Sequence, residues 1–316
     1  SPENLLATID YDYEIPDDDE LTITKAKNFR TVGLRQSYLE DETEYGKIAH
    51  YLVAPEDLIE LVESPELVDL GELADVMRGA MTGSTSFFFP DREDIDAYGI
   101  EDEFLLPALK SMRGYDTISY DKADVDRWFV DVHEYVEEVR GRPDNLLADE
   151  SLEEKVKSAL EEDGYTGLLS WIRHAENEDE HLGATCENRE VWFDFGEPPQ
   201  PEILFQKLLR ERLFSIYNLV GAVPSNAVDC IDVHSDVDSK ALFGVLNSSI
   251  TQTIMEVWGR NEAGMLQLMT YETKSLPVPD VRSMSDEELD TIRSVVDDIL
   301  ERGESELSEE HRNRLD

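Results

Sequence analysis

Short apolar stretches separated by turn residues predict that much of the chain forms strands. Alternating side chains such as Thr22-Ile23-Thr24 are typical of a strand with one buried face. Similar stretches predict strands at residues 31–34, 117–120, 127–130, 191–193, 202–205, 213–216 and 228–233. Turn-forming residues such as Gly221, Pro224 and Asn226 separate the later stretches, so residues 186–235 are expected to form a meander of strands.

Helices are predicted where apolar residues recur every three or four positions behind a capping residue. The segments Ser151–Glu154 and Ser285–Glu288 each have the spacing of a capping box, which satisfies free backbone N–H groups. The first opens a helix that Gly164 closes, and the second opens a terminal helix that Gly303 closes. Further helices are expected at residues 55–62, 92–98 and 239–258, whereas the polar residues 175–183 are expected to form a solvated loop.

The chain is strongly acidic. Its 316 residues carry a formal net charge of -45, from 73 acidic and 28 basic side chains, and the acidic residues are spread along the whole chain. A disordered acidic tail is excluded, because 40% of the residues are hydrophobic and can form a core. We interpret the composition as that of a halophilic, archaeal protein in a cytoplasm of multimolar salt. An acidic mesophilic protein or a nucleic-acid mimic is the alternative.

The negative charge does not exclude DNA as a partner when salt is concentrated. The Debye length is about 3 Å at 1 M salt, so carboxylates then repel phosphates only at contact distance. Counterion release also contributes little to binding at such concentrations. A DNA-binding protein of this composition would therefore depend on hydrogen bonds, base contacts and shape.

The sequence predicts a cytoplasmic protein without a membrane partner. No apolar run reaches the roughly 18 residues that a membrane helix needs, and the start at Ser1-Pro2-Glu3-Asn4 has no signal-peptide character. The two cysteines, Cys186 and Cys230, form no CxxC motif and no disulfide framework. This usage is typical of a reducing compartment.

No motif for methyl transfer is found. The sequence has no glycine-rich loop between a predicted strand and helix. The segment Glu197-Pro198-Pro199-Gln200 lacks both the amide or acid and the aromatic residue of the tetrad that holds a flipped adenine. We interpret it as a rigid turn, and we expect no catalytic residue and no bound cofactor in this chain.

Two further patterns fall short of a nuclease or a metal site. Glu153 and Lys155 follow an aspartate as nuclease residues do, but side chains two positions apart on a helix do not share a face. His174, His181 and Cys186 match no standard zinc spacing. We therefore expect neither phosphodiester cleavage nor metal binding.

The positive signal for nucleic acid is a set of sparse basic residues beside turns and aromatic residues. Arg78 precedes a loop in which the Thr82 and Ser84 hydroxyls could approach a phosphate. Taken one by one, each cation is better explained by an ordinary surface ion pair with a carboxylate, so no single one identifies a function. We expect the functional ones to share one face from which carboxylates are absent. The residues expected to contact DNA are Arg78, Thr82, Ser84, Lys110, Arg113, Arg189, Trp192, Arg210, Arg212, Asn226 and Lys274.

The order of several segments resembles the C-terminal target-recognition region of type IIG and type IIS restriction–modification N6-adenine DNA methyltransferases of the gamma type. Each motif is degenerate, but their order and spacing are moderately specific over about residues 66–282. The segments are Leu73 to Gly83 followed by Phe87-Phe88, Tyr98 to Lys110, Pro201 to Leu204 with Arg210 to Phe214 and then Asn226, Leu246-Asn247-Ser248-Ser249, and Leu276-Pro277-Val278-Pro279.

This resemblance implies an α+β fold with mixed, mostly antiparallel sheets flanked by helices. It also implies a catalytic methyltransferase domain upstream that uses S-adenosylmethionine, so the chain would be a fragment of that protein or a separate subunit. Residues 1–64 would be the tail of that domain or an N-terminal extension, residues 65–282 the DNA target-recognition domain, and residues 283–316 a C-terminal helix. Double-stranded DNA and the catalytic domain are the expected partners, because a methylated adenine must leave the stack.

Two alternatives remain open at this point. The first is a stand-alone DNA specificity subunit, although such subunits usually carry two recognition domains joined by long helices. The second is a non-enzymatic protein-interaction module of a phage-defence complex that uses its acidic face.

Overall fold

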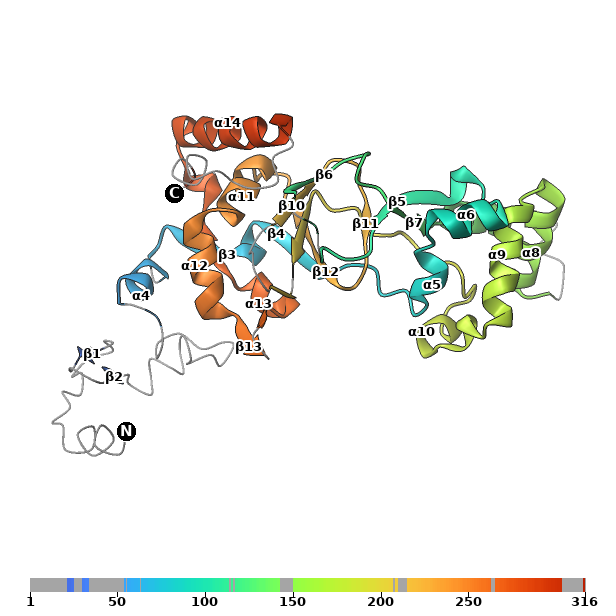
Figure 1. Ribbon diagram of the computed structural model, residues 1–316, viewed down its shortest axis with the longest axis horizontal. Coiled ribbons are helices and arrows are strands. Elements are labelled where there is room, and N and C mark those ends of the chain that lie inside the picture. Colours follow the sequence, from blue (N-terminus) through green and yellow to red (C-terminus); the bar gives the residue numbers. More distant parts are fainter. Residues whose placement is uncertain are drawn as a thin grey trace.

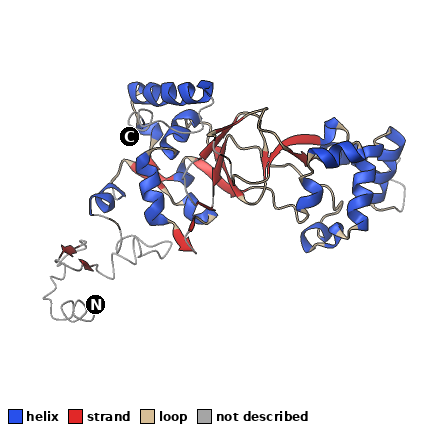
Figure 2. Ribbon diagram, in the orientation of Figure 1, coloured by secondary structure: helices blue, strands red, loops and turns tan. Residues whose placement is uncertain are grey.

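Helices lie at both ends of an elongated molecule, and the largest sheet lies between them (Figure 1). Figure 2 shows the same division by secondary structure, with most strands near the middle. This computed structural model describes residues 22–25, 30–33, 54, 56–62, 64–113, 115, 117–142, 150–206, 208–209, 215–262, 265–302 and 315.

The central sheet has five strands in the order β4, β12, β8, β10, β6. All neighbours are antiparallel except β10 and β6. The strands are β4 (Ala74–Arg78), β6 (Ser119–Tyr120), β8 (Ile203–Gln206), β10 (Ser215–Asn218) and β12 (Val228–Val233). Side chains of β8 enter two cores alternately: Ile203 and Phe205 pack on one face of the sheet and Leu204 on the other. Both faces of the sheet are therefore buried at β8.

A three-stranded sheet links the central sheet to one of the helical ends. In it, β5 (Leu105–Leu109) pairs antiparallel with β7 (Arg127–Val130) and parallel with β11 (Val223–Pro224). The smaller pairings are β1 (Thr22–Lys25) with β2 (Arg30–Gly33), β3 (Leu67–Asp69) with β15 (Pro277–Pro279), and β14 (Met265–Gln267) with β9 (Leu208–Leu209) and β13 (Arg260–Glu262). Mixed and antiparallel sheets flanked by helices confirm the predicted fold class.

The C-terminal lobe packs several helices against one face of the central sheet. Its helices are α4 (Glu56–Val62), α11 (Ser239–Leu246), α12 (Ser249–Trp258), α13 (Thr270–Lys274) and α14 (Asp286–Arg302), with the 3-10 turns η1 (Leu70–Glu72) and η5 (Val281–Ser283). Phe243, Leu246 and Val296 are buried in its core. A Cβ on Gly244 would lie 2.5 Å from Ile292 Cγ2, so α11 and α14 approach closely there.

The helical lobe at the other end has a separate, aromatic core. Its elements are α5 (Thr85–Phe88), α6 (Arg92–Tyr98), η2 (Asp102–Phe104), α7 (His133–Gly141), α8 (Leu152–Asp163), α9 (Thr166–Asn177), η4 (Glu180–Leu182) and α10 (Ala184–Glu187). The Phe87 ring stacks on Trp171 with centroids 6.1 Å apart and lies 4.7 Å from Trp192. This core does not share residues with that of the C-terminal lobe.

Several predicted elements are confirmed close to their expected ends. The helix over residues 92–98 ends where Gly99 adopts φ 69°, in the left-handed region that favours glycine. Ser151 accepts a hydrogen bond from Glu154 N and begins α8, which ends at Gly164. The terminal helix begins after Ser285, whereas Gly303 lies outside the described residues.

Three local predictions were wrong, each because tertiary contacts outweighed the local pattern. The single helix over 239–258 is two helices, because Asn247 turns to bind Ser215 and Ser248 caps α12. Residues 175–183 are not a solvated loop, since α9 continues to Asn177 and η4 follows. Residues 191–193 are buried in the aromatic core and form a turn, not a strand.

Candidate nucleic-acid interface

Three segments far apart in the sequence meet at Ser225. Ala80 N donates to Pro224 O at 2.7 Å, and Ser225 N donates to Leu109 O at 3.0 Å. The Ser225 hydroxyl also donates to the backbone oxygen of Lys110 at 2.6 Å. As a result, the ends of β4, β5 and β11 lie together, and each is next to a residue expected to contact DNA: Arg78, Lys110 and Asn226.

Gly79 allows this close approach. A Cβ there would lie 2.2 Å from the backbone oxygen of Ser225 and 2.6 Å from that of Pro224. Any larger residue would push β4 away from the segment that carries Asn226. The glycine after Arg78, which the sequence suggested only as a loop residue, is therefore a packing requirement.

The segment after β5 presents two cations to solvent. Met112 is buried beside Leu109 and Tyr120, and it holds the segment against the central sheet. On either side of it, Lys110 and Arg113 are exposed. Burial of the central methionine thus turns its two basic neighbours outward.

Most basic residues of the described part fall into two groups. Nine make ion pairs with carboxylates, and they lie on the two groups of helices or beside them: Arg92, Arg127, Arg140, Arg142, Lys157, Arg173, Lys240, Arg282 and Arg293. Six have no carboxylate partner among the residues that the structure describes: Arg78, Lys110, Arg113, Lys122, Arg189 and Lys274. Arg189 lies in the helical lobe. The other five lie at the end of β4, on the segments that follow β5 and β6, or on α13.

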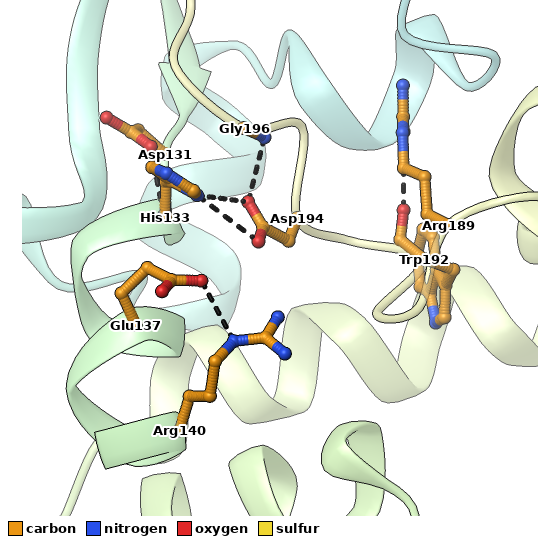
Figure 3. Close-up of polar contacts among 8 residues, drawn as sticks. All are labelled: Asp131, His133, Glu137, Arg140, Arg189, Trp192, Asp194 and Gly196. Carbon is orange, nitrogen blue, oxygen red and sulfur yellow. Dashed lines mark hydrogen bonds and ion pairs between the residues drawn. The ribbon is translucent and has the colours of Figure 1, made fainter.

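Arg189 has a structural position. Its guanidinium donates to Met81 O at 3.4 Å and to Trp192 O at 3.3 Å, and lies 5.3 Å from the ring centroids of both Phe88 and Phe195 (Figure 3 shows its bond to Trp192). Burial lowers the pKa of this guanidinium from its ordinary value. The side chain therefore joins the segment after β4 to the aromatic core.

Three expected DNA contacts face inward. Thr82 and Ser84 are 3% and 5% exposed, and Trp192 is 3% exposed. The Ser84 hydroxyl caps α5 and bonds to Glu180, while the indole N–H of Trp192 donates to Glu176 at 3.2 Å. In this conformation all three side chains are buried, and those of Ser84 and Trp192 are bonded inside the protein.

The remaining expected contacts have varied surroundings. Asn226 is exposed. Lys274 is also exposed, and its aliphatic stem lies over Gly71, where a Cβ would come within 2.6 Å of it. Arg210 and Arg212 lie outside the described residues.

Sequence reasoning missed three polar residues around Arg78. Ser225 is the residue at which the strands meet. Thr270, at the start of α13, accepts a hydrogen bond from Arg78 Nε at 3.4 Å and donates one to Asp229 Oδ1 at 2.9 Å. Asp229 was detectable in principle, because it is an acidic residue between Val228 and Cys230 in an otherwise apolar part of a strand.

A second polar cluster lies in the helical lobe (Figure 3). Asp194 accepts hydrogen bonds from Gly196 N at 2.8 Å and lies 3.2 Å from His133 Nδ1. Asp131 accepts from His133 N at 3.1 Å, and burial raises the pKa of the Asp131 carboxyl. These contacts fix the start of α7 to the segment that leaves the lobe.

Within the described residues, no group of three or more His, Cys, Asp or Glu side chains is placed to hold a metal ion. None of the helices in that part is both long and apolar enough to cross a membrane.

Two solved structures can be compared with this chain. One is described as the type IIG restriction endonuclease BpuSI, with a TM-score of 0.53 and 15% identity over 78% of this chain and 27% of that chain. Another is the type IIL restriction-modification enzyme MmeI in complex with DNA, with a TM-score of 0.49 and 15% identity over 78% of this chain and 32% of that chain. The chain thus spans about a third or less of the length of both, and the likeness to BpuSI shows a shared fold.

The sequence gives a more specific assignment. The family described as type II methyltransferase M.Eco57I, C-terminal domain, matches residues 45–308. The chain therefore belongs to this family of C-terminal domains from restriction–modification enzymes. A comparison with curated proteins found no match.

Proposed function

We propose that this chain is the DNA target-recognition region of a restriction–modification N6-adenine methyltransferase. It would hold duplex DNA while a catalytic domain elsewhere flips an adenine out of the stack and methylates it. The observation that carries the proposal is that three cations without a carboxylate partner among the described residues, Arg78, Lys110 and Arg113, lie where three strand ends meet. Membership of the M.Eco57I C-terminal domain family supports the same assignment.

Charge strengthens this argument. In a chain with 73 acidic residues, a surface cation has many carboxylates within reach. Nine described cations make ion pairs with one or more of them. Of those that have none, Arg78, Lys110 and Arg113 lie near the strand ends that meet at Ser225. Such a grouping is expected if the cations are kept for an anion that binds from outside, and backbone phosphates attract this kind of side chain.

The residues would divide the work. Lys110 and Arg113 contact phosphates from the loop that Met112 anchors. The contacts extend along the duplex through Asn226, Lys274, Arg210 and Arg212. Arg189 acts indirectly, by holding the segment after β4 at Met81.

Methyl transfer belongs to the partner domain in this proposal. S-adenosylmethionine and the catalytic residues would come from that domain, in the same chain or in another. Labelled S-adenosylmethionine mixed with this chain and DNA should give no incorporation, and addition of the catalytic domain should restore it. Incorporation by this chain alone would contradict the proposed division.

DNA binding is the direct test. The affinity of the chain for a mixed-sequence duplex is measured by fluorescence anisotropy from 0.2 M to 1 M KCl. Lys110→Ala and Arg113→Ala should each weaken binding to all duplexes alike, and each should reduce the slope of log K against log salt by about 0.9. Arg173→Ala is the matched control, because Arg173 is exposed but paired with Glu161 in the helical lobe.

The outcomes separate the candidate functions. If Lys110→Ala, Arg113→Ala and the control Arg173→Ala weaken DNA binding equally, the proposed interface is wrong. Complete lack of DNA binding by the wild-type chain, at every salt concentration and with the catalytic domain present, would favour a protein-interaction module instead. The proposed setting is the cytoplasm of a halophilic archaeon.

A further inference from the structure

Arg78 is held differently from the other cations around the central sheet. Its Nε atom donates to Thr270 Oγ1, and the Thr270 hydroxyl donates to the carboxylate of Asp229. Arg78 and Asp229 stand directly opposite one another on β4 and β12, so their side chains project from the same face of the sheet. Three residues from three elements thus form one chain of hydrogen bonds.

The carboxylate at the inner end is fully buried. Asp229 is 0% exposed, whereas Arg78 at the outer end is exposed. Burying a carboxylate is costly unless it is hydrogen-bonded, so its position implies a fixed arrangement. The threonine hydroxyl transmits that arrangement to the arginine.

This arrangement orients Arg78 without occupying its outer nitrogens. In the described part of the chain, Nη1 and Nη2 of Arg78 make no hydrogen bond or ion pair. By contrast, both terminal nitrogens of Arg282 donate, to Glu72 O and to the Asp280 carboxylate, and Nη1 of Arg140 donates to Glu190. A guanidinium held at Nε presents its two terminal N–H groups outward as a fixed fork.

The surroundings of Arg78 fit contact with bases. Tyr271, next to Thr270, is 44% exposed, and Met81, three residues beyond Arg78, is 53% exposed. Exposed apolar and aromatic side chains beside a polar reader can contact thymine methyl groups or base edges. Among the described residues, no buried partner holds the side chain of Lys110 or Arg113. Such side chains suit contact with phosphate, which is less directional than contact with a base.

We propose that Arg78 determines specificity by donating two hydrogen bonds to O6 and N7 of a guanine in the major groove, and that Thr270 and Asp229 are positioning residues for it. This inference rests on the proposed DNA-binding function and deepens it. A fixed fork is the geometry that matches this base edge, and among the base pairs only guanine offers two adjacent acceptors there.

The experiment uses the full chain and a pool of duplexes with a randomised central region. Bound duplexes are sequenced for the wild type, Arg78→Ala, Arg78→Lys and Thr270→Val. Arg78→Ala should abolish the preference for guanine at one position and leave the other positions unchanged. The loss of discrimination at that base pair should be roughly 5- to 150-fold. Thr270→Val keeps the volume of the side chain and should weaken the same preference in part.

A modified base tests the contact itself. The selected duplex is prepared with 7-deazaguanine, which lacks the N7 acceptor, at the position that Arg78→Ala affects. The wild type should bind this duplex more weakly than the unmodified one, whereas Arg78→Ala should bind both equally. A purely structural role of Arg78 would lower both affinities without removing the difference.

Two controls complete the design. Thr253→Val removes an exposed threonine hydroxyl that bonds to Ser249 O on α12, and should leave the sequence preference intact. Lys110→Ala should weaken binding to all duplexes alike. An unchanged guanine preference in Arg78→Ala, or a uniform loss with a smaller salt slope, would overturn the inference while DNA binding stands. Retention of no duplex by the wild type would overturn the proposed function as well.

Discussion

The Ser225 hydroxyl donates a hydrogen bond of 2.6 Å to the backbone oxygen of Lys110, 115 positions earlier in the chain. Ser225 N donates to Leu109 O as well, so one residue holds the end of β5 through two bonds. The backbone at Lys110, the first cation after β5, is therefore fixed by the segment that carries Asn226. Under the proposed function, stability and DNA binding would be coupled at this point.

Ser225→Ala should lower the free energy of unfolding by about 1 kcal/mol, because a buried hydroxyl and its acceptor lose their bond. Hydrogen exchange at residues 110–113 should also become faster. Ser170→Ala is the control, since Ser170 makes a similar bond to Thr166 O on an exposed helix face. Equal exchange in the two variants would show that Ser225 does not anchor the loop.

Gly167→Ala should be destabilising by about 1–3 kcal/mol or more. A Cβ at this position would lie 1.8 Å from the backbone oxygen of Gly99, and nearby backbone N–H groups of Gly167 and Leu168 bind the Glu101 carboxylate at 2.9 and 2.8 Å. Gly141→Ala, with nothing within 4 Å of the added Cβ, should be neutral or stabilise by up to about 1 kcal/mol. Chemical denaturation of both variants measures the difference, and similar midpoints would contradict this packing.

Asp131→Asn should stabilise the protein at neutral pH. Burial raises the pKa of Asp131 in the folded state, and the negative charges of Asp194 and Glu134 raise it further. The hydrogen bond from His133 N and the charge of His133 lower this pKa, but by less. The folded state then binds more protons than the unfolded state, so wild-type stability falls as pH rises from the ordinary value of 3.8 through the raised pKa. Asparagine keeps an acceptor for His133 N and removes the charge.

The advantage of the asparagine variant in melting temperature should therefore grow between pH 4 and pH 7. Asp163→Asn should behave in the opposite way, because hydrogen bonds from Arg142 and Tyr135 lower the pKa of Asp163. Its carboxylate contributes stability above the ordinary pKa, and that contribution disappears as pH falls through the lowered one. A pH-independent difference for Asp131→Asn would show that its charge is not strained by burial.

The sequence predicted local elements well where capping residues define them. Asp91 and Gly99 limit α6, and Ser151 and Gly164 limit α8, because these residues satisfy backbone groups within a few positions. The break at Asn247 could not be predicted in this way. Its cause is a bond to Ser215, which lies 32 positions away.

The candidate site shows the same limit. The notion that scarce cations avoid carboxylates selected Arg78, Lys110 and Arg113, which indeed have no such partner in the described part of the chain. Ser84 and Trp192 were selected because they lie beside a glycine loop and an arginine, and nothing local shows that these two side chains are buried. The roles of Thr270 and Asp229 depend on strand pairing, which a single sequence does not reveal.

The melting temperature of the chain should rise as KCl increases from about 0.1 M to above 2 M. A net charge of -45 repels itself at low ionic strength, and screening relieves this repulsion as the Debye length shrinks from about 10 Å at 0.1 M to about 3 Å at 1 M. The same series near pH 4.2, where the net charge is close to zero, separates screening from general salt effects, because only screening should vanish there. A melting temperature that falls with KCl at pH 7 would contradict adaptation to concentrated salt. It would also remove the condition under which so acidic a surface can approach DNA.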